Sequence, residues 1–469
     1  MRSIPLITLL GLQNEEHPSL TLLGLQDEEH PSLTLIGLQD EEHPSLALLG
    51  LQDEERPSLT ARITGRGASL SHSARITGRG ASLSPSARIT GRGASLSPSA
   101  RITGRGASLS HSARITKAIV SQNPKLSKEQ RTELRESKGH DMTFQRYHRY
   151  ADMLRYIEHL TVAFSHLVEV VTIGKTNEGV ALKVVKVSSG SASPEEGTVK
   201  PAVWIDGGMH AREWISPAVV MYVLKQLVER YKVNKKIVDS ADWYLMPLAN
   251  PDGYEYSHSI DRLWRKTRSN HDTTQNRNFG RLLWGSCEGV DLNRNWDFHW
   301  GGKGASDDPC HETYAGPRPF SEPESRAISE FLMDHKDRIK LYLTLHSYSQ
   351  VRLTLHSYSQ MWLLPWGFTS KKVPDYDDMY TMGRKAVEAI SKISGTQYQI
   401  GSSTSLLYPS SGGSDDWAKG VAGIKYAYTV ELRDRGSYGF LLPASQIIPT
   451  GKETFAAIKS IARAIVCKT

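Results

Sequence analysis

The stretch PAVWIDGGMHAREWIS, at residues 201–216, decides the fold of this chain. Its segment Ala202–Asp206 is apolar and predicts a buried strand. Ser216 and Pro217 then predict the start of a helix, with the serine as its cap and the proline in its first turn. Apolar residues continue along one face of that helix, at positions 220, 223, 224, 227 and 228. A strand that runs through a short turn into an amphipathic helix is typical of an α/β fold.

Further runs typical of strands lie on both sides of this unit. They are short and rich in aliphatic and aromatic residues, and they comprise Ala181–Val187, Trp243–Leu248, Lys340–Leu345 and Ile424–Leu432. Amphipathic segments separate them. The pattern predicts an α/β domain in which helices cover a largely buried sheet.

The first 116 residues differ in kind from the rest, because they consist of two tandem repeats of 13 residues. A unit close to PSLTLLGLQDEEH runs from Pro18 to Arg56, and ARITGRGASLSHS runs from Ala61 to Thr116. Codon degeneracy allows both units to be one DNA repeat read in two frames. Such repeats could stack as a solenoid, but the second unit has too few apolar residues to bury a face. We expect a disordered or mispredicted head at 1–116, a linker at 117–141 and one folded domain at 142–469.

The charge of the chain gives weak guidance about partners. The formal net charge is +7, and all of the excess lies beyond residue 116. No cluster of Lys and Arg with interleaved aromatic residues accompanies it, so we expect no nucleic-acid partner. No run of 18 apolar residues predicts a membrane span. The start, MRSIPLITLL, has too short an apolar stretch for a signal peptide and no small-residue cleavage site.

His210 and Glu213 lie three residues apart, directly after the predicted strand and before the predicted helix. A catalytic zinc ion takes three protein ligands, such as two imidazoles and a carboxylate, and keeps a fourth position open. A pair at a strand-to-helix turn can converge on one ion. Taken alone, such a pair is more often found on a protein surface. The flanking residues therefore have to show whether His210 and Glu213 bind zinc.

Those flanking residues carry a family resemblance. PAVWIDGGMHAREWIS closely resembles the first zinc signature of the pancreatic-type metallocarboxypeptidases, the family of carboxypeptidases A and B. The resemblance implies a mixed central β-sheet covered by helices on both faces, one zinc ion per chain, and hydrolysis of the C-terminal peptide bond of peptides and proteins. Further family motifs follow in order within residues 140–469: NPDGYEYS at 250–257, RLWRKTRS at 262–269, GVDLNRNWD at 289–297, HSYSQMWLLPWGF at 356–368, SSGGSDDW at 410–417 and VELRDRGSYGFLLPASQI at 430–447.

The third zinc ligand has two candidates, because LTLHSYSQ occurs at both 343–350 and 353–360. Only His356 continues into the apolar run MWLLPWG that the family motif has, so we predict His356 as the ligand. His346 is the alternative, since it has the better strand before it, IKLYLTLH. A ten-residue insertion cannot stay in register inside a central strand, so one copy has to leave the sheet.

The resemblance also implies catalytic roles. Peptide hydrolysis needs a base to activate water and a cation to stabilise the developing oxyanion. Glu431, in VELRD, matches the general base of the family. Arg265, in LWRKTRS, matches the arginine that polarises the scissile carbonyl. Asp291 resembles the carboxylate that orients a zinc-binding imidazole, here His210.

An exopeptidase must also recognise a free C-terminal carboxylate, which amide and guanidinium donors bind well. Asn293 and Arg294 resemble the carboxylate clamp of the family, and Tyr408 resembles its mobile phenol. Arg212 and Arg262 match positions that hold the substrate further from its end. All five are therefore predicted to bind substrate.

Asp415 occupies the position that resembles the bottom of the specificity pocket, with Ser403 predicted to line the same pocket. B-type members have Asp there, whereas members that select hydrophobic C-termini have an apolar residue. Because a buried carboxylate without a counter-charge is costly, a Lys or Arg side chain of the substrate would neutralise it. We therefore predict release of C-terminal Lys and Arg. The alternatives are an internal cation beside Asp415, an A-type preference, or a non-catalytic binder of C-termini whose zinc site the duplication disrupts.

Cys287 and Cys310 match the positions of a family disulfide. With that support we expect an extracellular protein, since disulfides persist in oxidising compartments. We expect the enzyme to act as a monomer, with Cys467 unpaired. The signal peptide and inhibitory pro-domain that secreted members normally carry are not recognisable in this sequence.

Overall fold

The computed structural model describes residues 139–191, 199–271, 287–347 and 360–466, together with the backbone of short strands among the repeats. The chain divides into two units, Met1–Ser121 and Gln122–Thr469. Each unit is considered by itself below.

The described part of the first unit consists of short strands that follow the repeats. They pair in parallel, and most pair with the equivalent strand two repeats further along, as Ser19 does with Ser45 and Ser32 with Ser58. The expectation of a disordered or mispredicted head falls largely on residues outside the described part. The strands are β1 (Ser19–Thr21), β2 (Ser32–Ile36), β3 (Ser45–Ala47), β4 (Ser58–Thr64), β5 (Ser69–Leu70), β6 (Ile76–Thr77), β7 (Ser82–Leu83), β8 (Arg88–Thr90), β9 (Ser95–Leu96) and β10 (Ile102–Thr103).

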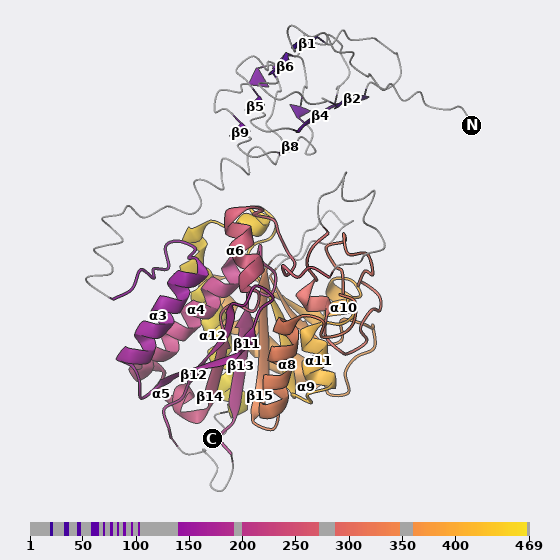
Figure 1. The fold of residues 1–469 in the computed structure, drawn as a ribbon. Helices are drawn as coiled ribbons and strands as arrows, with labels where there is room; N and C mark the ends of the chain where they lie inside the picture. The colour runs from indigo at the N-terminus through magenta and orange to yellow at the C-terminus, as the bar shows by residue number, and fades with distance from the viewer. Residues whose placement is uncertain are drawn as a thin grey trace. The chain divides into compact units, whose positions relative to one another are not determined.

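The second unit is built on an eight-stranded mixed sheet, in the order β11-β12-β14-β13-β15-β18-β16-β17 (Figure 1). The four central strands β14, β13, β15 and β18 are mutually parallel. They read as continuous apolar runs because both faces of a parallel sheet are covered. The bounds are β11 (Val168–Lys175), β12 (Ala181–Val187), β13 (Ala202–Gly207), β14 (Asp242–Met246), β15 (Ile339–Ser347), β16 (Met361–Leu364), β17 (Gln399–Ser402) and β18 (Tyr426–Leu432).

Helices cover both faces of this sheet, as predicted (Figure 1). One apolar core joins the sheet to α3, α4, α5, α9 and α12, and the other joins it to α8 and α11. The helices are α3 (Tyr150–Ala163), α4 (Ile215–Val228), α5 (Tyr231–Ser240), α6 (Pro251–Ser259), α8 (Pro323–His335), α9 (Tyr376–Ser394), α10 (Ser403–Leu406), α11 (Ser414–Gly420) and α12 (Ile447–Val466), with short 3-10 turns at Leu292–Arg294, Gly439–Leu441 and Ala444–Gln446.

The turn between β13 and α4 differs in one detail from the prediction. The predicted strand and the apolar stripe of α4 are confirmed, but the helix begins at Ile215 and its N-cap residue is Trp214. The hydroxyl of Ser216 does not cap the helix. It donates to the carbonyl of Leu345 and accepts from the amide of Gly208 at 2.9 Å. Ser216 therefore fastens the turn that carries His210 to the neighbouring strand β15.

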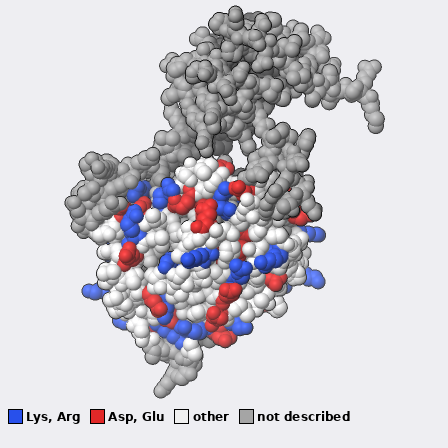
Figure 2. Space-filling view, in the orientation of Figure 1, with Lys and Arg blue, Asp and Glu red and all other residues white. Residues whose placement is uncertain are grey.

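The surface of the second unit carries charges of both signs. On the face drawn in Figure 2, Lys and Arg side chains are interspersed with Asp and Glu. The excess positive charge is not gathered into one continuous patch on that face. Among the helices that the structure describes, none has the length and apolar character needed to cross a membrane.

Glu324, in the first turn of α8, provides a test of this packing. Its side chain is fully buried, and burial together with Glu322 and Asp252 raises its pKa to about 8 from an ordinary value of 4.5. Between those two pH values the unfolded chain loses a proton that the folded chain keeps, so this group lowers stability as pH rises. Glu324→Gln is expected to raise the free energy of unfolding at pH 8 by about 2–4 kcal/mol, with little effect at pH 5.

Urea unfolding at the two pH values measures this difference. Glu330→Gln, at an exposed position of the same helix, is the matched control and should change stability little at either pH. A Glu324→Gln effect of the same size at pH 5 and pH 8 would contradict the expected titration.

Candidate active site

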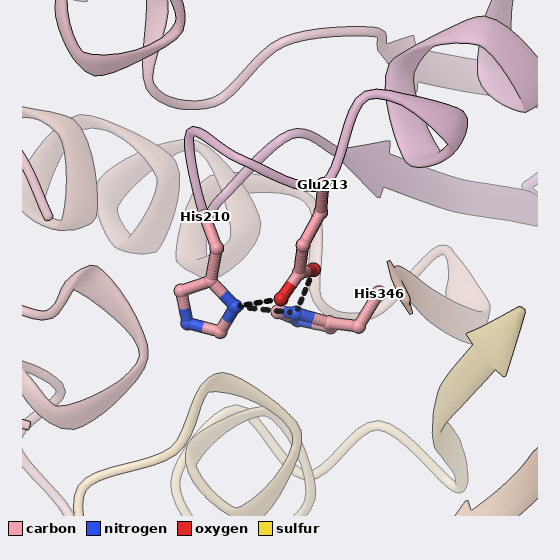
Figure 3. Close-up of side chains that lie close together, drawn as sticks. All are labelled: His210, Glu213 and His346. Carbon is pink, nitrogen blue, oxygen red and sulfur yellow. Dashed lines mark hydrogen bonds and ion pairs between the residues drawn. The ribbon is translucent and has the colours of Figure 1, made fainter. Parts of the chain in front are cut away.

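Three buried side chains converge at the carboxyl edge of the central strands (Figure 3). His210 and Glu213 come from the turn after β13, and His346 lies near the end of β15. His210 Nδ1 lies 2.8 Å from Glu213 Oε1 and 3.1 Å from His346 Nδ1, and His346 Nδ1 lies 3.2 Å from Glu213 Oε2. Their potential ligand atoms all lie within 4.8 Å of one another.

This donor set fits a zinc ion. A tetrahedral zinc with bonds of about 2.1 Å keeps neighbouring donors about 3.4 Å apart, close to the observed spacings. Two imidazole nitrogens and a carboxylate are also the ligand types of catalytic zinc sites. Within the described residues, no other group of three His, Cys, Asp or Glu side chains meets the same geometry. Burial alone would raise the pKa of Glu213, but the two histidines hold it well below its ordinary value.

Asp291 connects the first histidine to Arg265. Its Oδ1 lies 3.1 Å from His210 Nε2, and its Oδ2 accepts hydrogen bonds from Arg265 Nε at 3.0 Å and Nη2 at 2.8 Å. Burial opposes ionisation of Asp291, but Arg265 and His210 hold its pKa well below the ordinary range. The carboxylate therefore orients the imidazole and the guanidinium at once, which fits its predicted role and extends it to Arg265.

The third member of the cluster is His346, the alternative candidate from the duplicated segment. The predicted ligand His356 lies outside the described residues. His346 Nε2 lies 3.1 Å from the hydroxyl of Thr344, which in turn donates to Asp206 at 2.7 Å. Sequence reasoning did not single out Thr344 or Asp206. The available signal was the two-residue period of a strand, which places Thr344 and His346 on one face of the sheet.

Glu431 lies on β18 next to this cluster. The parallel register pairs it directly with His346, and its side chain is buried. Burial lowers the pKa of the His346 imidazole, but Glu213 and then Glu431 outweigh burial and raise this pKa above its ordinary value. A carboxylate is therefore held beside the donor set, at the edge of the sheet where the predicted base should lie.

The predicted carboxylate clamp is also close by. Asn293 and Arg294 follow Asp291 in a 3-10 turn. The Asn293 side-chain oxygen accepts from the amide of Ser414 at 3.0 Å, which leaves its NH₂ group as the donating end. Arg294 is buried and uses Nε and Nη1 to bind the carbonyls of Gly304 and Asn293. Tyr408 is 42% exposed, and the mobile role predicted for its phenol stays a prediction.

Arg212 and Arg262, the two other arginines predicted to bind substrate, form hydrogen bonds with other residues of this chain. Arg212 donates to both carboxylate oxygens of Glu312, at 2.8 and 3.1 Å, and lies over the ring of Phe440. Arg262 donates to the carbonyls of Arg212 and Phe440 and stacks on Trp214. These contacts join the loops around the cluster. The substrate contacts predicted for Arg212 and Arg262 remain predictions.

Asp415 and Asp416 lie side by side in the first turn of α11, and they differ in their partners. Asp416 accepts from the backbone amides of Gly367 and Phe368. Burial raises the pKa of Asp415, and a hydrogen bond from Thr429 opposes that rise. Among the described residues, no Lys or Arg forms an ion pair with Asp415, so an internal cation is not found there. Ser403, the first residue of α10, donates to the carbonyl of Leu364.

A disulfide joins Cys287 to Cys310, as expected, with their Cα atoms 4.5 Å apart. It fixes the loop that carries Glu312. Cys467 lies outside the described residues.

Comparison with known proteins agrees with this site. The profile of the zinc carboxypeptidase family matches residues 153–457. Carboxypeptidase B of Astacus astacus is 46% identical over 321 residues, which cover 68% of this chain and 97% of that protein. Carboxypeptidase A4 of Mus musculus is 41% identical over 324 residues, covering 68% and 70%. The structure of bovine thrombin-activatable fibrinolysis inhibitor in complex with tick carboxypeptidase inhibitor is 38% identical, with a TM-score of 0.61, and the match covers 70% of this chain and 99% of that one.

The contact between Asp291 and His210 leads to a prediction about metal binding. Asp291→Asn should weaken zinc affinity by about 10- to 100-fold, because partners of a ligating histidine fix its orientation and raise its basicity. Competition with a chromophoric chelator measures the affinity. Asp297→Asn, at an exposed position of the same motif, is the control and should bind zinc like the unmodified chain. Unchanged affinity in Asp291→Asn would contradict the role of this carboxylate.

Proposed function

The chain belongs to the zinc carboxypeptidase family, and we propose that it is an exopeptidase that releases C-terminal Lys and Arg from peptides and proteins. The observation that carries this specificity is Asp415, a buried carboxylate that forms no ion pair with a Lys or Arg of the described residues. A cationic side chain of the substrate supplies the missing counter-charge. Ser403 is small enough to leave room for that long side chain.

In this proposal His210, Glu213 and His346 hold one zinc ion. Zinc bound there supplies a Lewis acid that polarises the scissile carbonyl and makes water more acidic. The match between the donor spacings and a tetrahedral ion supports this assignment. Asp291 and Thr344 orient the two imidazole rings through the Nε2 atoms, which face away from the metal site.

Glu431 acts as the general base. Its buried carboxylate, in register with His346, takes a proton from the attacking water and later delivers it to the leaving amine. Arg265 stabilises the negative charge that develops on the carbonyl oxygen. Its pairing with Asp291 through Nε and Nη2 fixes the guanidinium before substrate arrives, so little reorganisation is needed in the reaction.

Asn293, Arg294 and Tyr408 bind the terminal carboxylate, which makes the enzyme an exopeptidase. The amide end of Asn293 is oriented by the bond from Ser414, and Arg294 adds positive charge in a buried position where it is little screened. Arg212 and Arg262 contact substrate residues that lie further from the C-terminus of the substrate.

Two alternatives are less well supported. An A-type preference would place an uncompensated Asp415 against an apolar side chain, although relatives of both types resemble the chain. A non-catalytic binder of C-termini would need neither Glu431 nor Arg265. The Cys287–Cys310 disulfide supports an extracellular location, and we propose a monomer.

Peptides ending in Arg or Phe, incubated with the purified chain, test the activity. We expect release of Arg that a zinc chelator abolishes and added zinc restores, with much slower release of Phe. Faster release of Phe would instead establish the A-type alternative. Binding of peptides without turnover would establish the non-catalytic one.

Asp415→Asn tests the specificity separately. Removing the charge should lower kcat/KM for C-terminal Arg by roughly 100-fold or more, because a buried cation would lose its partner. The rate for C-terminal Phe should stay the same or rise. Asp377→Asn, at an exposed position of α9, is the control and should leave both rates unchanged. Equal losses for Arg and Phe would contradict a specificity role.

A further inference from the structure

Asp206, Thr344 and His346 are brought together by the register of two parallel strands. Thr344 and His346 are two residues apart on β15, so their side chains project from the same face of the sheet. Asp206 on β13 is the direct cross-strand partner of Thr344. The pairing of β13 with β15 therefore lines up a carboxylate, a hydroxyl and an imidazole.

Hydrogen bonds connect these side chains in one buried series. Trp204 Nε1 donates to Asp206 Oδ2 at 2.7 Å, and Thr344 Oγ1 donates to Asp206 Oδ1 at 2.7 Å. Thr344 Oγ1 also lies 3.1 Å from His346 Nε2. Asp206 and Thr344 are 0% exposed and His346 is 1% exposed. Water therefore does not compete for these bonds, and in a buried setting an unmade bond is costly.

The hydrogen bond from Thr344 to Asp206 sets an order of donors and acceptors along this series of side chains. A threonine hydroxyl has a single proton, and Thr344 gives it to the Asp206 carboxylate. Its oxygen is then left as an acceptor toward His346, so His346 Nε2 must carry the proton of the ring. The lone pair of the neutral ring is thereby placed on Nδ1, the atom that faces His210 and Glu213.

We propose that Thr344 and Asp206 are positioning residues that fix the tautomer and ring orientation of His346 for metal binding. This inference rests on the proposed function of His346 as a metal ligand. In this proposal the two histidines are oriented by different hydrogen-bond partners. His210 is held by a carboxylate directly, whereas His346 is held by a hydroxyl whose direction a second carboxylate sets.

Substitutions at Thr344 separate positioning from simple packing. Thr344→Val keeps the shape but removes the hydroxyl, and Thr344→Ser keeps the hydroxyl but removes a methyl group. We expect Thr344→Val to weaken zinc affinity by about 10- to 100-fold and Thr344→Ser to remain close to the unmodified chain. Asp206→Asn should weaken the affinity in the same direction. Thr450→Val, which removes a buried, hydrogen-bonded hydroxyl from α12, is the matched control and should leave metal affinity unchanged.

The measurement is chelator competition for zinc, combined with the visible spectrum of the cobalt-substituted chain and with thermal unfolding. An altered cobalt spectrum in Thr344→Val, restored in Thr344→Ser, supports positioning. Equal zinc affinities and equal spectra in all variants, with only the unfolding temperature changed, would overturn it.

A separate measurement on the unmodified chain does not depend on the folding of any variant. In the zinc-loaded chain, the ¹⁵N chemical shifts of His346 should show a protonated Nε2, and a protonated Nδ1 would overturn the proposal. Because the readouts are metal affinity and tautomer, a chain that binds zinc but releases no amino acid would contradict the proposed activity alone. The zinc affinity of Thr344→Val, compared with that of the unmodified chain, would still decide the role of Thr344.

Discussion

The parallel register of β13, β15 and β18 is the constraint on which the rest of the site depends. Parallel strands end at a common edge, so residues far apart in sequence meet there. His210 follows β13, His346 lies near the end of β15, and Glu431 pairs with His346 across β15 and β18. Ser216 fastens the first of these turns to the second strand. A shift of one residue in either pairing would turn the functional side chains to the opposite face.

Much of this could be predicted from the sequence, because apolar runs mark buried parallel strands. The runs at 181–187, 202–206, 243–248, 340–345 and 424–432 overlap observed strands. The strands β11, β16 and β17 were not predicted. β16 and β17 have only four residues each, and β11, at one edge of the sheet, is mostly half-buried or exposed, so its apolar pattern is weak. The ligand pair His210 and Glu213 was accessible from its motif. The support of His346 was not, because it depends on which residue of β13 lies opposite Thr344, and register is a tertiary property.

The choice between the two LTLHSYSQ copies shows the same limit. The copies are identical, so their own residues cannot decide which enters the sheet. The preceding residues can. If the second copy took the place of the first, Arg352 would replace Tyr342 at a fully buried position of β15. Taking the charge of an arginine out of water is costlier than burying a tyrosine. The buried residues Ile339, Leu341 and Tyr342 before the first copy therefore favour His346 in the strand, although the continuation after His356 resembles the family more closely.

Three buried aspartates around the site show how one residue type takes different roles. Asp291 is compensated by the charge of Arg265, so it is fixed and can orient His210 directly. Asp206 accepts hydrogen bonds from the neutral donors of Trp204 and Thr344, and the Thr344 hydroxyl connects it to His346. Asp415 forms no ion pair with any Lys or Arg of the described residues, although burial raises its pKa. Since an uncompensated buried charge is costly, we propose that Asp415 takes its counter-charge from the substrate.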